Sequence, residues 1–391
     1  MNQLREWLDM PVIDIRQAQC LNYKSSQAVC KRCVDICPTK ALELHDRSVK
    51  LIDKKCNDCT ACIAACPTLA VEYVPKPYTK IINEITAYPQ VNITCNVFEK
   101  LQKGIKIPCY RTIDPAMIAH FATVNRKQQI EGSVHAEGGI QAVYTLNLYT
   151  GECPGCKYHN VFDIHQHIEN LRQWCSQVGL PVEIHATDDA EFFLDKEDDV
   201  VSGVTRRSLL KNLRLRKAES VEQETEITAD PLTYSQRNNY KRLKIKQAMG
   251  SFKQEITSTQ RDIQRSLPEK EFSTLTLQGT CDKCGVCEAV CPTKALLWES
   301  KEDRAALIFD PQKCIACGRC EICPQQSLKI KPISVAAYYD VSLVNIVELP
   351  TKKCSDCGST FFIGDARETE QTLCHLCQIK AEKTRALLDS L

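Results

Sequence analysis

The sequence predicts a multidomain α+β protein, in which two related cysteine-rich modules flank a small α/β domain with a parallel sheet and a helical linker. Three observations support this. Eight cysteines lie at 20–66 and eight more at 281–323, and both groups contain runs that end in Cys-Pro. Residues 91–187 alternate between strand-like and helix-like patterns, which is typical of α/β domains. The last four cysteines form a separate C-x2-C-x16-C-x2-C pattern.

Composition limits the class of protein. The chain has 391 residues, 25% of them charged, and a formal net charge of +1, which gives no case for binding nucleic acid. No apolar run reaches about 18 residues, so we expect no transmembrane segment. The N-terminus lacks the apolar core of a secretory signal, and we expect a cytoplasmic protein. The 25 cysteines, grouped as C-x-x-C steps in a reducing compartment, favour metal thiolate sites over disulfides.

The two cysteine groups contain ladders with a defined spacing. "CNDCTACIAACP" at 56–67 and "CDKCGVCEAVCP" at 281–292 both match C-x2-C-x2-C-x3-C-P. A cubane cluster has four irons, each of which needs one thiolate, and a tight loop with a cysteine at every third residue can wrap three corners. The proline fixes the backbone where the loop ends and needs no hydrogen-bond donor there. A lone ladder would also suit a zinc knuckle, but paired ladders in two sets favour iron–sulfur clusters.

These ladders resemble those of bacterial ferredoxins with two [4Fe–4S] clusters, and the resemblance covers about residues 20–75 and 275–333. Each half also carries the usual short helical turn leading into a strand, in "PTKALEL", "PTLAVEY", "PTKALLW" and "PQQSLKI". In this family the fourth cysteine of a ladder binds the other cluster. The resemblance therefore implies four [4Fe–4S] clusters. Their ligand sets are set A (Cys20, Cys30, Cys33, Cys66), set B (Cys37, Cys56, Cys59, Cys62), set C (Cys281, Cys284, Cys287, Cys323) and set D (Cys291, Cys314, Cys317, Cys320).

Two of these cysteines depart from the family spacing. Nine residues separate Cys20 from Cys30. A longer loop can return a thiolate at modest entropic cost, and the alternative is a three-cysteine [3Fe–4S] site with Cys20 free. In "CIACGRCEICP" at 314–324, only two residues separate Cys320 from Cys323, where the other ladders have three. We expect Cys323 to remain a ligand, in an altered environment.

The middle of the chain predicts strands at 91–97, 104–109, 140–149 and 181–187. It also predicts helices at 114–124 and 164–180, the first capped by Asp114 with Pro115 in the first turn and the second closed by Gly179. Four cysteines fall at or just beyond the expected strand ends: Cys95, Cys109, Cys153 and Cys156. Ligands of α/β folds bind beyond the carboxyl ends of strands, so these thiolates are candidate ligands for a [2Fe–2S] cluster, a [4Fe–4S] cluster or Zn.

"PCYRTIDP" and "GECPGCKYHN" in this region resemble the delta subunit of methyl-viologen-reducing hydrogenase, over about 90 residues. That family passes electrons between a hydrogenase or formate dehydrogenase and a flavin-containing heterodisulfide reductase. The resemblance implies one [2Fe–2S] cluster on the four middle cysteines. It also implies partners among redox enzyme subunits, a flavoprotein or a soluble ferredoxin.

The linker and the tail complete the chain. Residues 205–217 are basic, and this run is either a solvated linker helix or a docking surface for an acidic partner, while 234–267 predicts one or two helices. At the C-terminus, Cys354, Cys357, Cys374 and Cys377 have the spacing of a zinc ribbon, in which four thiolates suit structural Zn. We place the domain boundaries at 1–80, 81–190, 191–272, 273–335 and 336–391.

The sequence contains no G-x-G-x-x-G, P-loop, H-E-x-x-H or G-x-S-x-G motif, so no catalytic residue is predicted. The most direct hypothesis is a multi-cluster electron-transfer subunit of a cytoplasmic redox enzyme complex. Two alternatives are a catalytic oxidoreductase, with substrate or flavin at the middle domain, and an assembly or maturation factor.

Overall fold

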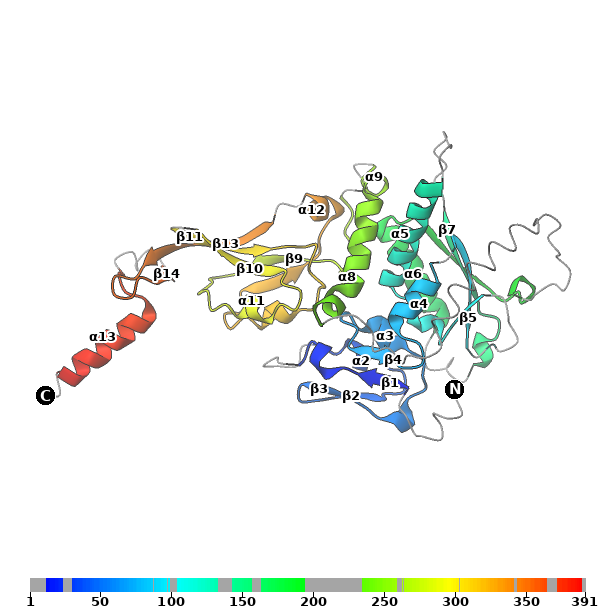
Figure 1. The fold of residues 1–391 in the computed structure, drawn as a ribbon, viewed down its shortest axis with the longest axis horizontal. Coiled ribbons are helices and arrows are strands. Elements are labelled where there is room, and N and C mark those ends of the chain that lie inside the picture. The colour runs from blue at the N-terminus through cyan, green and yellow to red at the C-terminus, as the bar shows by residue number, and fades with distance from the viewer. Residues whose placement is uncertain are drawn as a thin grey trace, which may run out of the picture.

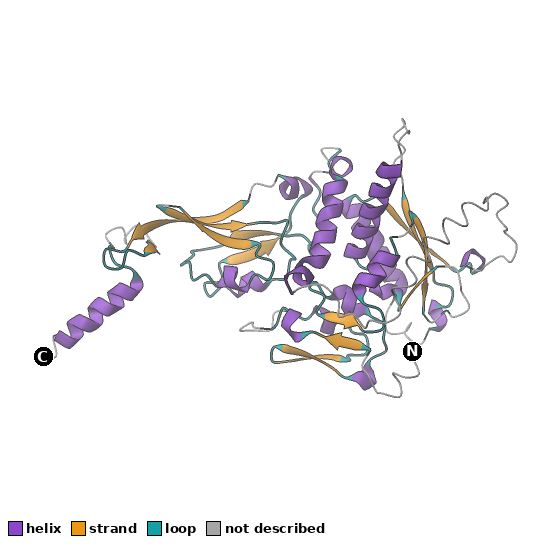
Figure 2. Cartoon of the chain, viewed as in Figure 1, coloured by secondary structure: helices purple, strands orange, loops and turns teal. Residues whose placement is uncertain are grey.

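The structure is a computed structural model, and Figures 1 and 2 show its mixture of helices and sheets. The residues that it describes are 12–23, 30–86, 88–96, 98, 104–132, 143–156, 163–193, 234–258, 262, 264–301, 303–340, 343–363 and 371–388. The basic run at 205–217 lies outside the described residues. Helices and strands of the described part form two ferredoxin-type modules, a parallel-sheet domain and a C-terminal knuckle (Figure 1).

The N-terminal module consists of two antiparallel strand pairs and short helices. Its elements are β1 (Ile13–Ile15), η1 (Gln17–Gln19), α2 (Arg32–Asp35), β2 (Leu42–His45), β3 (Ser48–Leu51), η2 (Asp53–Lys55), α3 (Ala61–Ala65) and β4 (Val71–Tyr73). β1 pairs with β4, and β2 forms a hairpin with β3. The hairpin turn contains Asp46 at φ 51°, and Asp is one of the residues that tolerate this left-handed conformation. The strand tails predicted after the first two Cys-Pro steps are β2 and β4.

The second module repeats this arrangement and then extends it. Its elements are β9 (Thr274–Leu277), α11 (Val286–Val290), β10 (Leu296–Ser300), β11 (Arg304–Phe309), η7 (Arg319–Ile322), β12 (Leu328–Lys331), α12 (Val335–Tyr339), β13 (Val344–Lys353), β14 (Thr360–Phe362) and α13 (His375–Leu388). β9 pairs with β12, and β10 forms a hairpin with β11. The long β13 pairs first with β11 and then with β14. It therefore connects the second module continuously to the knuckle, beyond which α13 projects (Figure 1).

The middle domain is a four-stranded sheet in which every pairing is parallel, in the order β6-β5-β7-β8. Its elements are α4 (Tyr78–Glu84), β5 (Gln90–Cys95), β6 (Ile105–Ile107), η3 (Tyr110–Thr112), α5 (Pro115–Gly132), β7 (Tyr144–Tyr149), η4 (Cys153–Gly155), α6 (Ile164–Val178), β8 (Val182–Thr187) and η6 (Glu191–Phe193). Asp114 Oδ1 accepts the Met117 N–H at 2.9 Å, and Gly179 adopts φ 82°. The predicted parallel sheet, N-cap and glycine C-cap are thus confirmed.

Helix α8 (Tyr234–Ser251), followed by α9 (Lys253–Ile256), lies between the parallel-sheet domain and the second module (Figure 1). The sequence places this segment in a charged linker, yet several of its charged side chains are buried. Arg237 pairs with Glu72 at 3.2 Å, and Lys241 pairs with Asp114 at 2.7 Å. One continuous core contains residues of the N-terminal module, the parallel-sheet domain and α8, and it extends to Val335 and Tyr338 of α12. The second module and the knuckle have cores of their own.

Candidate metal centres

Three of the cysteine ladders fold as loops in which left-handed residues stand between the cysteines. Positive φ occurs at two positions in each loop: Asp58 and Thr60, Lys283 and Gly285, Ala316 and Gly318. Such alternation of backbone hand curls the chain into a concavity whose N–H groups face an anion. A left-handed residue carries a steric cost unless it is Gly, Asn or Asp. The loop geometry therefore favours a negatively charged, thiolate-bound cluster at its centre.

The four cysteines of set A line one pocket, together with Arg32 and Val49. The segment that carries Cys20 is fastened beside Cys30 by Asn22, whose side chain is fully buried. Asn22 Nδ2 donates to the Cys30 carbonyl at 2.7 Å, and the Cys30 N–H donates to Asn22 Oδ1 at 2.9 Å. This amide clamp explains how the Cys20 thiol, separated from Cys30 by nine residues, returns to the ladder.

The cysteines of set B gather around Cys62. Burial is the main cause that raises the pKa of the Cys62 thiol, and nearby Cys59, Cys33, Cys56 and Cys37 raise it further. Cys33 belongs to set A, so the two sets are neighbours. A buried thiol with a raised pKa becomes a thiolate when a cation compensates its charge, which fits iron as the group held here.

The cysteines of set C also line one pocket, and Cys323 is among them. The ladder at 314–324 is one residue short between Cys320 and Cys323, and a change of helix type compensates for the missing residue. Cys287 lies in the α-helix α11, four residues before Cys291, whereas Cys320 lies in the 3₁₀-helix η7, three residues before Cys323. Four α-helical residues and three 3₁₀ residues both rise about 6 Å and complete about one turn. Cys323 therefore reaches the position that the family spacing requires.

Set D is assembled in the same way around Cys320, whose thiol pKa is raised by burial and then by Cys317, Cys314 and Cys291. Cys314 contacts the hydroxyl of the buried Ser273, with Sγ and Oγ 3.3 Å apart. In each module, the fourth cysteine of one ladder thus lies with the first three of the other.

Hydrogen bonds to sulfur distinguish the ladders. Cys37, Cys66 and Cys291 each accept the N–H of the residue four positions on, always at 3.2 Å. Each also has a threonine hydroxyl 3.8 Å from its sulfur. At Cys323 the threonine is replaced by Gln325, and we find no corresponding N–H···S bond among the described residues of this loop. Hydrogen bonds to sulfur tune cluster potentials, so Cys323 gives set C a different environment.

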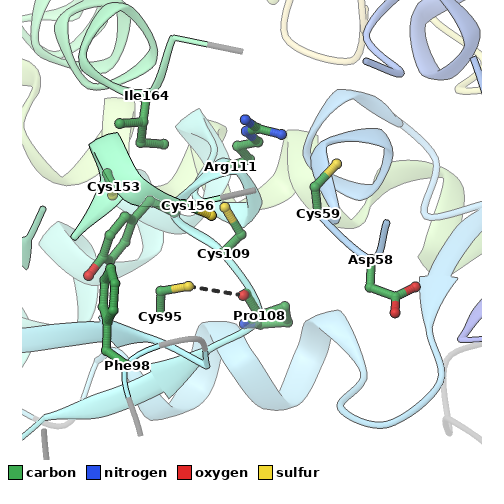
Figure 3. Close-up of a pocket in the computed structure, with 11 residues that line it drawn as sticks. Asp58, Cys59, Cys95, Phe98, Pro108, Cys109, Arg111, Cys153, Cys156 and Ile164 are labelled. Atoms are coloured by element: carbon green, nitrogen blue, oxygen red, sulfur yellow. Dashed lines mark hydrogen bonds between the residues drawn. The ribbon is translucent and has the colours of Figure 1, made fainter. Parts of the chain in front are cut away.

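In the middle domain, Cys95, Cys109, Cys153 and Cys156 line a single pocket (Figure 3). They lie at or just beyond the carboxyl ends of β5, β6 and β7. These strands are adjacent, at the point where the order of connection reverses, which is the usual ligand site of such sheets. The Cys95 thiol lies 3.4 Å from the Pro108 carbonyl oxygen. A hydrogen bond to Cys95, with burial next, raises the pKa of the Cys109 thiol. Four converging thiols form a donor set suited to an iron–sulfur cluster or Zn.

The same pocket reaches the N-terminal module, because Asp58 and Cys59 also line it. Arg111, only 3% exposed, lies between Cys109 and Cys59 (Figure 3). The Thr60 and Thr112 hydroxyls hydrogen-bond to each other beside it. Set B and the middle cysteines are therefore adjacent.

In the C-terminal knuckle, the sulfurs of Cys354, Cys357, Cys374 and Cys377 all lie within 4.8 Å of one another. The Cys357 and Cys374 sulfurs are 3.7 Å apart, close to the edge of about 3.8 Å that Zn–S bonds of about 2.3 Å give a tetrahedron. Backbone N–H groups of Cys357 and Cys374 lower the pKa of the Cys354 thiol to about 6. Hydrogen bonds from Ser359 also lower the pKa of Cys357, and four closely spaced thiols suit a metal ion that binds thiolate.

The comparisons with known proteins agree with the two modules. The sequence model of the 4Fe-4S dicluster domain family matches residues 11–74 and 280–327. A search of curated proteins found no significant match to the chain. Dicluster domains of this type hold iron–sulfur clusters and transfer electrons. Within the described residues, no helix is long and apolar enough to cross a membrane.

Sequence reasoning missed the side chains that connect the sets. Asn22 and Ser273 lie outside the quoted motifs, and Arg111 and Arg319 lie inside motifs that were read for their cysteines alone; each acts on cysteines through contacts that the fold creates. A buried polar side chain beside a ladder would have been the only local signal, and burial is not visible in an isolated sequence.

Proposed function

We propose that the chain is a multi-cluster electron-transfer subunit of a redox enzyme complex, with [4Fe–4S] clusters on sets A to D. A fifth redox centre, a [2Fe–2S] cluster, occupies the four middle cysteines, and structural Zn occupies the knuckle. The bound clusters supply one-electron storage, while the chain holds them, shields them from water and adjusts their potentials.

One observation carries this proposal: Cys59 shares a pocket with the four middle cysteines. A metal centre in the middle domain would therefore be adjacent to the N-terminal dicluster module. The partners that fit this function are a second redox enzyme subunit and a flavoprotein or soluble ferredoxin. They would exchange electrons with the clusters at the two ends of the series of centres.

Metal and sulfide analysis of the anaerobically purified chain, with EPR after stepwise reduction, tests the proposal. Four [4Fe–4S] clusters, one [2Fe–2S] cluster and one Zn require about 18 irons and about one zinc. The Cys109→Ser chain should lose the [2Fe–2S] signal and keep the others. Fewer than about eight irons per chain would contradict an electron-transfer role.

The same purification separates the alternatives. A flavin absorption spectrum would instead indicate a catalytic oxidoreductase with an organic cofactor at the middle domain. Clusters that transfer intact to an apo-protein would indicate an assembly factor.

A further inference from the structure

We propose that the five cysteine sets form one unbranched row, in the order middle set, B, A, D and C, with arginines at the two junctions between domains. Arg111 adjusts the reduction potentials of the middle centre and set B, and Arg319 adjusts those of sets A and D. This inference rests on the proposed function, because it needs clusters at all five sets.

The first junction joins the middle domain to the N-terminal module through Arg111. Its side chain forms a hydrogen bond with the Cys59 thiol of set B. Its backbone N–H forms one with the Cys109 thiol of the middle set. One residue therefore contacts a cysteine of each set, and Figure 3 shows Arg111 beside both Cys109 and Cys59.

The second junction joins the two ferredoxin-type modules. Arg32 lines the pocket of set A, and its guanidinium donates to the Ala316 carbonyl at 2.8 Å, inside the loop of set D. Arg319, 8% exposed, lies between the same sets. It stands in the set D loop between Cys317 and Cys320, and its charge interacts with the Cys317 thiol of set D and the Cys20 thiol of set A.

Rigid packing holds the second junction in place. From α8, Arg242 donates to the carbonyls of Pro311, Gln312 and Glu271 at 2.7, 2.9 and 3.0 Å. These carbonyls lie in the second module, just before its set D loop and its strand β9. The helix that is buried in the core of the first two domains thus fixes the distance between sets A and D.

The charges explain why arginine stands at both places. A cluster held by thiolates is net negative and gains one more negative charge on reduction. Inside a protein, a fixed positive charge nearby acts with much less screening than in water. Each buried guanidinium therefore stabilises the reduced form of the two centres that it faces, and those centres in turn compensate its own burial.

The test compares two variants that serve as controls for each other. EPR-monitored redox titrations are run on the full-length chain and on Arg111→Gln and Arg319→Gln. Signals are assigned with one Cys→Ser ligand variant per set.

Arg111→Gln should lower the reduction potentials of the middle centre and set B alone. Arg319→Gln should lower the reduction potentials of sets A and D alone. Each shift should approach a tenfold change in the one-electron equilibrium, which corresponds to about 59 mV. Arg111→Lys and Arg319→Lys, which keep the charge, should recover most of the shift.

Unchanged potentials, or equal shifts at all centres in both variants, would overturn the inference. If a glutamine variant fails to fold, the wild-type chain still provides a test. Magnetic coupling between the reduced middle centre and set B should split their EPR signals, and the splitting should vanish in Cys109→Ser. A chain that binds all of its clusters but shows no such splitting would also contradict the proposed order of the centres. Missing clusters, in contrast, would count against the proposed function, so the two failures are distinguishable.

Discussion

The side-chain amide of Asn22 makes two hydrogen bonds with the backbone of Cys30, at 2.7 and 2.9 Å. Asn22 itself is fully buried, and its backbone N–H also donates to the Cys20 thiol. This relationship converts a nonstandard spacing into a four-thiol pocket. Cys20 is placed beside the other set A cysteines by a residue that belongs to no cysteine motif.

Asn22→Ala should therefore release Cys20 from set A. Loss of two partly buried hydrogen bonds should destabilise this loop by about 1–3 kcal/mol, and set A should become a [3Fe–4S] centre on the remaining cysteines. EPR of the oxidised chain would show the new signal. Asn170→Ala, at an exposed position of α6, is the matched control and should leave the spectrum unchanged. An unaltered set A in Asn22→Ala would show that the clamp is dispensable.

Gln325→Thr should raise the potential of set C. The change restores the hydroxyl that stands 3.8 Å from Cys37, Cys66 and Cys291, and a hydrogen bond to sulfur favours the reduced cluster. We expect a shift smaller than about 59 mV, the equivalent of tenfold in the one-electron equilibrium. Thr293→Val should produce the opposite shift in set D, because it removes that hydroxyl from Cys291. Redox titration of both variants checks the two directions, and a lower potential in Gln325→Thr would contradict the explanation.

Lys241→Met should destabilise the chain strongly. Lys241 pairs with the buried Asp114 at 2.7 Å, and also donates to the carbonyls of Ile63 and Ala64 at 2.6 and 2.9 Å. Removing one partner of a buried ion pair leaves the other uncompensated, at a cost of about 3–5 kcal/mol. Chemical denaturation followed by circular dichroism measures the loss.

The control for that variant is Arg304→Ala, because Arg304 pairs with Glu348 on an exposed surface. Exposed pairs contribute at most about 1 kcal/mol. An equal loss of stability in Lys241→Met and Arg304→Ala would show that the buried contacts of α8 do not hold the domains together.

Removal of metal from the knuckle should change the fluorescence of Trp298 in the second module. The Phe362 ring of β14 lies 5.9 Å from the Trp298 ring, and Lys283 stands 3.2 Å from the Phe362 ring centroid. Cys374→Ser should lower zinc by about one ion per chain and change Trp298 fluorescence, since β14 loses its support. The four [4Fe–4S] signals should persist. Unchanged fluorescence in the zinc-free chain would mean that the hairpin folds without metal.

His120 should make the stability of the α5–α8 contact sensitive to acid. Burial, followed by the charges of Lys244 and Lys127, lowers the pKa of His120 from its ordinary value of 6.5 to about 4. The unfolded chain therefore takes up the proton at a higher pH than the folded chain does. The contribution of neutral His120 to the stability of the folded chain is fully present above its ordinary pKa of 6.5. It decreases as the pH falls towards the lowered pKa of about 4. A pKa difference of about one between the folded and unfolded chains corresponds to about 1.4 kcal/mol.

Partial exposure of the His120 ring reduces this effect, so we expect a loss of about 1–3 kcal/mol in acid. In His120→Gln, the denaturation midpoint should depend less on pH between 6.5 and about 4, the range set by the two pKa values. An identical pH dependence in the variant and the wild-type chain would exclude His120 as the cause.

Much of the architecture was predictable from local patterns. The alternation of strand-like and helix-like segments over 91–187, with Asp114 and Gly179 at helix ends, predicted the parallel sheet because caps and periodicity act over a few residues. The ladders predicted two dicluster modules for the same reason. Helix α8 could not be assigned its role, since the buried positions of Arg237, Lys241 and Arg242 depend on carboxylates and carbonyls far away in the chain.

By itself, the sequence determined which thiols form each ladder loop, because their spacing acts over one or two turns of backbone. Only the tertiary structure decided which sets are neighbours. It placed Arg111 between Cys59 and Cys109, and Arg32 against the Ala316 carbonyl, through contacts between residues far apart in the chain. It also replaced an α-helical turn by a 3₁₀ turn before Cys323, so that a ladder one residue short still reaches its pocket. The physical reason is that thiol spacing is a property of the local chain, whereas the order of the centres depends on how whole domains pack.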